Sequence, residues 1–224
     1  MIGFISDIHG NYPALQAVLS ELDKLNCKKL YFLGDVTGYY CMVNECMDAL
    51  RERNVECILG NHDYYILNNE KCPRSYTVNK CLDFQRTVIR EDNFKWLRTF
   101  RNQIKVDDIS MVHGGWNDYL DEYISDFSFL DKKEGFSFFF SGHTHVQIER
   151  KGQYGRYYNP GSVGQPRDRD SRAAYAYMDD KKKVHLKRVE YDIDQIVFAM
   201  KKAGFEDRIS SCLYHGVKIG EDGT

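Results

Sequence analysis

The chain has 224 residues, of which 42% are hydrophobic and 14% aromatic, and this composition is typical of a globular protein with a sizeable core, not of a disordered segment. Its 31 basic and 33 acidic residues give a formal net charge of -2, so overall charge gives no reason to expect nonspecific binding to DNA or to a membrane surface. The length predicts a single domain over residues 1–224.

The N-terminal quarter of the chain predicts alternating strands and helices. Three short apolar runs that stop at Asp or Gly indicate buried strands, at residues 2–6, 30–33 and 55–59. The stretches between them, residues 11–25 and 43–53, have apolar residues at helical spacing, and Pro13 stands in the opening turn of the first. This order is typical of a parallel sheet covered by helices.

The remainder of the chain predicts a helical stretch followed by paired strands. Residues 75–100 have helical spacing, and Asp92-Asn93 is expected to divide them into two helices. Strands are predicted at residues 104–106, 109–112, 136–140, 147–149, 156–158, 173–178 and 184–191. Asp192 is a predicted N-cap for a last helix that ends near residue 203.

Cysteine usage and the N-terminus favour a cytoplasmic setting. The seven cysteines are odd in number and show no C-x-x-C spacing, which argues against a disulfide framework and against a cysteine zinc site. The first residues carry no basic segment followed by a long apolar run, so we expect neither a signal peptide nor a membrane anchor.

Five of the seven histidines lie in short motifs, each at or after the end of a predicted strand. The motifs are Asp7-Ile8-His9-Gly10-Asn11, Gly34-Asp35, Gly60-Asn61-His62-Asp63, His113-Gly114-Gly115 and Gly142-His143-Thr144-His145. Ligand crevices of open α/β sheets lie at the carboxyl ends of the strands, so these loops are expected to converge. Imidazole, carboxylate and amide oxygen are common ligands of divalent transition metals, and their number predicts two ions.

Each motif alone has a simpler interpretation. Asp-x-His can be a solvated turn, Gly34-Asp35 is a turn signal, and residues 60–63 could form an Asn-capped loop. A single histidine such as His113 is more often a buried residue with satisfied hydrogen bonds. The two alternate histidines, His143 and His145, are the hardest to explain by packing, and the five motifs together favour one metal centre.

The five motifs in this order resemble those of the calcineurin-like metallophosphoesterases. The Asp-x-His-Gly-Asn opening and the stretch Asn159-Pro160-Gly161-Ser162 are most similar to the small bacterial and archaeal phosphodiesterase branch. The resemblance implies an α/β fold, a four-layer α-β-β-α sandwich of two mixed β-sheets flanked by helices. It also implies a dinuclear centre of divalent or transition metal ions (Mn, Fe, Zn or Ni), of which we favour Mn.

The resemblance also assigns roles to the motif residues. It implies that Asp7, His9 and His145 bind one metal, that Asn61, His113 and His143 bind the other, and that Asp35 bridges both. A hydroxide shared by the metals would attack the phosphorus. His62 would be the general acid for the leaving group, and Asp63 would orient its ring.

The expected substrate is a small phosphodiester or a nucleotide. Asn11 and Arg167 are candidate substrate-binding residues, because Arg suits bidentate recognition of phosphate; Arg169 is a further candidate, and a surface role is the alternative for both arginines. Three aromatic residues close to the motifs could line a leaving-group pocket: Tyr39, Tyr40 and Trp116. There is no sign of a membrane partner and no strong sign of nucleic-acid binding.

Two alternatives to a small-molecule phosphoesterase remain. One is a non-catalytic, metal-binding scaffold of the same fold that acts through protein contacts, and the other is a nuclease. The presence of His62 and of every implied ligand favours an enzyme over the scaffold. The sequence after Asp35, Val36-Thr37-Gly38, and Asp63 in place of Glu both differ from the Ser/Thr protein phosphatases and argue against that branch.

Overall fold

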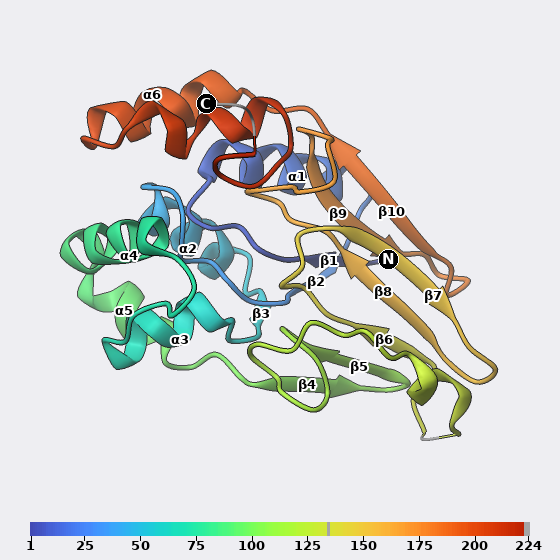
Figure 1. The fold of residues 1–224 in the computed structure, drawn as a ribbon. Coiled ribbons are helices and arrows are strands. Elements are labelled where there is room, and N and C mark those ends of the chain that lie inside the picture. Colours follow the sequence, from blue (N-terminus) through green and yellow to red (C-terminus); the bar gives the residue numbers. More distant parts are fainter. Residues whose placement is uncertain (134, 222–224) are drawn as a thin grey trace.

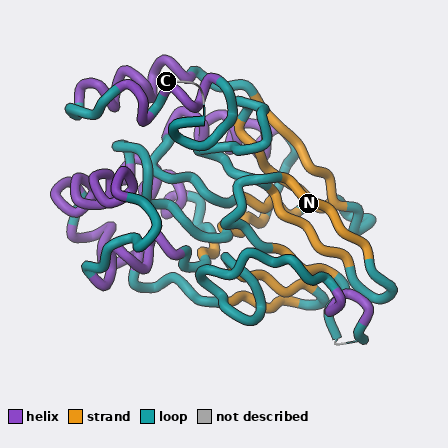
Figure 2. The backbone as a smooth tube through the Cα atoms, viewed as in Figure 1, coloured by secondary structure: helices purple, strands orange, loops and turns teal. Residues whose placement is uncertain are grey.

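Two five-stranded β-sheets and six α-helices make up the part of the chain that the computed structural model describes, residues 1–133 and 135–221. The strands gather on one side of the molecule and the helices on the other (Figure 1). Loops and turns fill the zone between them (Figure 2). None of the helices in the described ranges is both long and apolar enough to cross a membrane.

The first sheet has the strand order β10-β9-β1-β2-β3. Its strands are β1 (Ile2–Ile5), β2 (Lys29–Phe32), β3 (Glu56–Cys57), β9 (Ala173–Met178) and β10 (Val184–Val189). β1 pairs with β2 in parallel and β2 with β3 in parallel, whereas β9 is antiparallel to both β1 and β10. The sheet is therefore mixed, and its three N-terminal strands end at the same edge.

The second sheet has the order β4-β5-β6-β8-β7 and is also mixed. Its strands are β4 (Gln103–Val106), β5 (Ile109–Val112), β6 (Phe138–Phe140), β7 (Gln147–Lys151) and β8 (Arg156–Pro160). The central strands β5, β6 and β8 run parallel, and β4 and β7 form antiparallel edges.

Alternation along β1 shows how the layers stack. Phe4 faces the second sheet, where its ring lies 3.9 Å from that of Phe140 and packs in a core with Tyr31 and Tyr158. The next residue, Ile5, faces the opposite way into the core shared with the helices, as expected when successive side chains of a strand point to opposite faces. The core between the sheets is thus built from both inner faces.

The helices form the layer beside the first sheet. They are α1 (Tyr12–Lys24), α2 (Val43–Glu52), α3 (Asn61–Asn68), α4 (Tyr76–Val88), α5 (Glu91–Leu97) and α6 (Ile193–Lys202). Of these, α1 packs on β9 and β10, and the others pack on α1 or on one another. The second sheet is covered instead by the connection that contains the short 3₁₀ helix η1 (Ser128–Asp131), where Leu130 packs on Phe139 and Tyr157. The predicted α/β sandwich of two mixed sheets is confirmed, with an irregular segment as its fourth layer.

One local prediction was wrong, and the alternative interpretation of residues 60–63 as a loop is excluded. The helical stretch divides at Ile89, which has an extended backbone, and not at Asp92, which lies in the first turn of α5; an acidic residue there interacts favourably with the helix dipole. Residues 61–63 begin the helix α3 and do not form a loop. The Asp63 side chain accepts a hydrogen bond from the Gly60 backbone N–H, which caps this helix.

Candidate metal centre

The predicted ligands all follow strands at one end of the two sheets. Asp7 and His9 follow β1, Asp35 follows β2, and His113 follows β5; Asn61 opens α3 after β3, and the remaining two histidines follow β6. Positive φ angles occur at five of the ligands: Asp7 (54°), His9 (52°), Asp35 (65°), His143 (68°) and His145 (62°). Residues other than glycine rarely adopt this backbone conformation, and such backbone strain concentrates at functional sites.

Two glycines allow the ligands to approach one another. A Cβ atom on Gly60 would lie 2.0 Å from Asp35 Oδ1, and one on Gly38, where φ is +131°, would lie 2.4 Å from His9 Nδ1. Both distances are far below van der Waals contact. Only glycine fits these positions while the carboxylate and the imidazole keep their places.

Asp7, His9 and His145 form the first group of donor atoms. The Nε2 atoms of the two histidines are 3.0 Å apart, and Asp7 Oδ1 lies 3.8 Å from His9 Nε2 and 3.4 Å from His145 Nε2. All three side chains are buried. Three donors this close, from two loops far apart in sequence, could hold one metal ion.

Backbone carbonyls fix the orientation of three ligand histidines. His9 Nδ1 lies 2.6 Å from the Thr37 oxygen, His145 Nδ1 2.7 Å from the Gln165 oxygen, and His113 Nδ1 2.8 Å from the Leu33 oxygen. A carbonyl can only accept, so each Nδ1 must donate its proton, and the Nε2 of a neutral ring then presents a lone pair to the cluster. This arrangement is the one that metal-binding histidines adopt, and the donor set therefore fits a metal.

Asn61, His113 and His143 form the second group. Asn61 Oδ1 lies 3.1 Å from His113 Nε2 and 3.2 Å from His143 Nδ1. His143 therefore turns Nδ1 toward its neighbours, whereas the other ligand histidines turn Nε2. An amide oxygen and two imidazoles make a donor set that adds no negative charge of its own.

Asp35 lies between the two groups. Its Oδ2 atom is 3.4 Å from His113 Nε2 and 3.8 Å from His9 Nε2, so it faces one member of each group. Its Oδ1 atom accepts a hydrogen bond of 2.9 Å from the His62 backbone N–H. This position suits a carboxylate shared by two ions.

Burial and mutual charge shift the pKa values of these groups. Burial lowers the pKa of His9 and His145 well below the usual value and that of His143 to about 3, so these imidazoles are neutral and able to coordinate. Burial also raises the pKa of Asp7 to about 7. At Asp35, burial is the largest single effect and acts to raise the pKa, but His113, His62 and His9 together outweigh it and the pKa falls. A bound cation would stabilise both carboxylates in their charged form.

His62 lies beside the two groups, with its Nε2 atom 3.9 Å from Asp35 Oδ2. Its ring meets the rings of His9 and Tyr39 at centroid distances of 5.0 and 5.3 Å. The side chain is 6% exposed, and burial lowers the pKa of its imidazole to about 4. Aromatic packing thus holds His62 at the edge of the donor cluster.

The expectation that Asp63 orients the His62 ring is wrong. The Asp63 carboxylate accepts hydrogen bonds from the backbone N–H groups of Asp35, Thr37 and Gly60 at 2.9, 3.0 and 3.1 Å, and from Thr37 Oγ1 at 2.9 Å. His62 Nδ1 has no hydrogen-bond partner among the described residues. Asp63 therefore ties the Asp35 loop to the start of α3.

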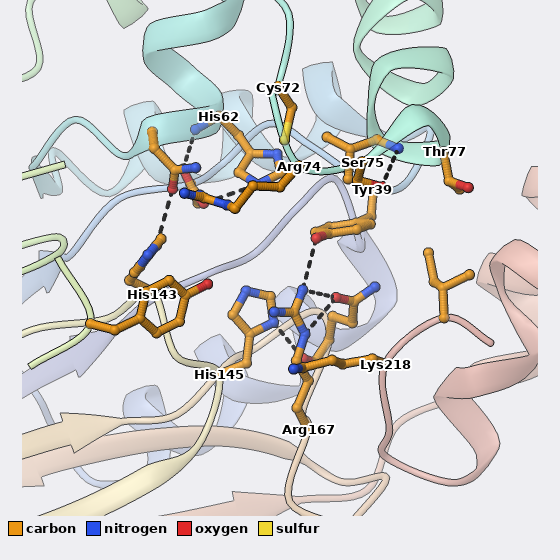
Figure 3. A pocket seen from close by; sticks show the side chains of 16 residues that line it. Tyr39, His62, Cys72, Arg74, Ser75, Thr77, His143, His145, Arg167 and Lys218 are labelled. Atoms are coloured by element: carbon orange, nitrogen blue, oxygen red, sulfur yellow. Dashed lines mark hydrogen bonds and ion pairs between the residues drawn. The ribbon is translucent and has the colours of Figure 1, made fainter. Parts of the chain in front are cut away.

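A cavity of about 310 Å³ opens beside the donor atoms (Figure 3). Its wall includes Asp35, Asn61, His62, His143 and His145, together with Tyr39, Tyr123, Arg74, Arg167 and Lys218. Arg167 donates to Tyr39 Oη at 2.8 Å and to Gln165 Oε1 at 2.6 Å. A cationic and aromatic wall therefore continues from the ligand cluster into the cavity.

Some predicted substrate residues lie elsewhere. Asn11 is buried, caps the N-terminus of α1 and donates to the Gly164 carbonyl oxygen at 2.8 Å, so its prediction as a substrate contact was wrong. Arg169 is exposed, Tyr40 is buried in the core, and Trp116 lines a different cavity. Of the three aromatic candidates, only Tyr39 lines the cavity at the ligand cluster.

Several cavity residues were missed by sequence reasoning. Arg74 precedes α4, Tyr123 belongs to the connection after β5, and Lys218 lies near the C-terminal end of the described chain. They stand outside the His/Asp motifs, and neither spacing nor composition marks them.

Comparison with known proteins agrees with this site. A family model described as the calcineurin-like phosphoesterase superfamily domain matches residues 1–183. The chain is 31% identical over 245 residues to the uncharacterized protein MJ0912 of Methanocaldococcus jannaschii, covering 96% of this chain and 98% of that one.

Two solved structures share the fold over nearly the whole chain. A metallophosphoesterase from Sphaerobacter thermophilus is 28% identical, with a TM-score of 0.83 over 96% of this chain and 99% of that one. The hypothetical protein PH1004 from Pyrococcus horikoshii OT3 is 22% identical, with a TM-score of 0.86 over 97% and 100% of the two chains. The family match, supported by the converging ligand cluster, shows that the chain belongs to the calcineurin-like phosphoesterase superfamily and is a metal-dependent phosphoesterase.

Proposed function

We propose that this phosphoesterase hydrolyses small phosphodiesters or nucleotides, with His62 as the general acid. The observation that carries the proposal is the shared cavity: metal donors, His62 and Arg167 all line it. A substrate phosphate in this cavity would face the metal centre, a proton donor and an anion-binding guanidinium together. Those are the three groups that hydrolysis of a phosphoester needs.

The donor set can hold two divalent ions. Asp7, His9 and His145 would hold one, Asn61, His113 and His143 the other, and Asp35 would contact both. When bound, two such ions supply an ionised water as nucleophile and positive charge that stabilises the attacking and leaving oxygens. Asp7 and Asp35 are the only carboxylates in this donor set, so the occupied centre would keep a net positive charge that attracts an anionic phosphate.

His62 is placed to protonate the leaving group. It lines the cavity, and its Nε2 atom lies on the side of the ring that faces Asp35. Packing against His9 and Tyr39 restricts the ring, so a proton on Nε2 would be delivered at a fixed position. An alkoxide leaving group needs such a proton far more than a nitrophenolate does, because the alkoxide is the much stronger base.

The size and charge of the cavity favour a small substrate. Its volume of about 310 Å³ lies near the lower end of small-molecule pockets, roughly 300–1,000 Å³. Arg167 has no carboxylate within ion-pair distance among the described residues, and neutral acceptors hold its guanidinium. An unpaired, half-buried guanidinium suits a substrate phosphate, and Tyr39 and Tyr123 could pack against a base or aryl group.

The alternatives are less well supported. A scaffold does not need a proton donor beside the metal ligands, and no observation favours one here. The cavity of about 310 Å³ is small for a nuclease substrate. Mn as the resident metal, a cytoplasmic location and a single domain over residues 1–224 stay predictions.

A substrate panel tests the proposed function. The full chain, loaded with Mn²⁺ and checked by elemental analysis for two bound ions, would be assayed on four substrate classes. These are phosphomonoesters, cyclic nucleotides, dinucleoside polyphosphates and bis(p-nitrophenyl) phosphate. We expect hydrolysis of at least one diester or nucleotide. Turnover of none of them by protein with two bound ions would overturn the proposal.

A further inference from the structure

His143 is held differently from the other ligand histidines. His9, His113 and His145 each direct Nδ1 to a backbone carbonyl oxygen. His143 instead uses Nδ1 to face Asn61 Oδ1 at 3.2 Å. Its Nε2 atom is buried and makes no hydrogen bond within the described ranges. The outward nitrogen of this ligand therefore lacks the backbone anchor that the other three have.

A carboxylate from another loop lies beside this nitrogen. Asp121 Oδ1 is 3.5 Å from His143 Nε2, and the Tyr123 ring packs on the His143 ring with centroids 4.2 Å apart. Both residues belong to the connection between β5 and β6. Backbone bonds close the start of this connection, since Gly114 N donates to the Tyr119 oxygen at 2.7 Å. The loop thus presents Asp121 from a defined position.

Arg74, from the segment between α3 and α4, fixes the Asp121 carboxylate. Two guanidinium nitrogens of Arg74 donate to the two Asp121 oxygens, each at 2.5 Å. Arg74 lies between α3 and α4, 47 residues before Asp121. A bidentate pair restricts both the place and the rotation of a carboxylate. The position of Asp121 relative to His143 therefore depends on Arg74.

We propose that Asp121 is the positioning residue for His143 and that Arg74 acts through Asp121. With a metal on Nδ1, the Nε2 atom of His143 carries the proton and donates it in a hydrogen bond to Asp121 Oδ1. A carboxylate in this place fixes the tautomer, holds the ring plane and increases the basicity of the ligating nitrogen. The positioning role rests on the proposed assignment of His143 as a ligand of the second ion.

The test measures metal binding by the full chain in chelator competition, with Mn²⁺ as the probe and no substrate. For Asp121→Ala we expect the ion at Asp7, His9 and His145 to bind as in the wild type. The ion at His143 should bind about 10- to 100-fold more weakly, as for other losses of a hydrogen-bond partner behind a metal ligand. Asp121→Asn, which keeps an acceptor oxygen, should recover part of this loss.

A double-mutant comparison separates Arg74 as a positioning residue from Arg74 as a substrate contact. Arg74→Ala alone should weaken the binding of the same ion. It should cause no further loss of affinity in the Asp121→Ala background, because the effects of two residues that act through one path are not additive. The control is Asp126→Ala, which removes an exposed carboxylate of the same connection that bonds only to Ser128 in the described ranges.

The outcomes are distinct. Three results for Asp121→Ala would each overturn the positioning role. They are equally weaker binding of both ions, unchanged binding of both ions, and a lower melting temperature in excess chelator with normal metal affinity. The last result would show that Asp121 only stabilises the loop. The wild type could fail to hydrolyse any substrate of the panel while Asp121→Ala selectively loses the second ion. That pair of results would overturn the proposed function and leave the role of Asp121 supported.

Discussion

The two halves of the proposed metal centre are built in different ways. The inner group (Asp7, His9 and His145) has both imidazoles anchored to backbone carbonyls. The outer group (Asn61, His113 and His143) has one imidazole anchored to the backbone and one that faces the side chain of Asp121. Backbone anchors follow from the fold itself, whereas a side-chain anchor can change without disturbing the sheets. On the proposed ligand assignment, we therefore expect substitutions to change the metal affinity of the outer group more readily than that of the inner group.

The strongest test of this comparison is Asp35→Ala, because Asp35 Oδ2 faces a histidine of each group. We expect loss of both ions and of all activity, since the substitution removes the one proposed shared carboxylate from among buried imidazoles. Elemental analysis after dialysis measures the bound metal directly. Asp35→Asn keeps an acceptor for the His62 backbone N–H and shows how much of the loss comes from charge.

Retention of two equivalents of metal by Asp35→Ala would contradict the bridging position. Retention of one equivalent would show that the two groups bind their ions independently. The difference in anchoring would then be the main determinant of affinity, in place of the shared carboxylate.

A second test separates proton transfer from metal binding. His62→Ala removes a side chain that neither group includes, so both ions should stay bound. The rate on an alkyl diester should fall about 10²- to 10⁴-fold, the usual contribution of a general acid, and less on bis(p-nitrophenyl) phosphate. Steady-state kinetics on the two substrates, with metal content measured in parallel, gives the comparison.

His185→Ala is the matched control for this substitution. His185 stacks on Tyr177 and pairs with Asp179 on the β9–β10 hairpin, outside all the motifs. Full activity of His62→Ala on the alkyl diester would show that another group donates the proton.

The sequence was sufficient to predict the strands and the convergence of the candidate ligands. Each N-terminal strand is a short apolar run that ends at a Gly or Asp, and its polar motif follows at once, so spacing alone places the ligands at one edge. Asn61, His143 and the other predicted ligands all lie in the cluster for this reason. Long-range convergence could be predicted here because the parallel strands impose it.

The contacts around the ligands could not be predicted in the same way. His62 and Asp63 are neighbours in sequence and seemed a natural pair, but they are consecutive residues of α3, and adjacent side chains on a helix do not face each other. Asp63 points instead to backbone N–H groups of the Asp35 loop and of Gly60. The Arg74–Asp121 pair joins two irregular segments, whose relative position no periodicity encodes.

The smallest effect is expected at Arg167, which follows the loop that anchors the inner group. The Gln165 carbonyl holds His145 Nδ1, and the Gln165 side chain holds the Arg167 guanidinium. Arg167→Ala should keep both ions and lower kcat/KM by roughly 10- to 100-fold, mainly through KM, because a charge-assisted hydrogen bond contributes about 1.5–3 kcal/mol. Arg167→Lys should recover part of this loss, since it keeps the charge without the planar fork.

Arg169→Ala is the control for this substitution, because Arg169 is exposed two residues further along and does not line the cavity. We expect its kinetics to match those of the wild type. A normal KM for Arg167→Ala would show that the substrate phosphate binds away from the inner group. If Arg167→Ala instead lost the ion at Asp7, His9 and His145, metal binding by the inner group would depend on the Gln165 loop. Substitutions would then change the metal affinity of the backbone-anchored group as readily as that of the outer group.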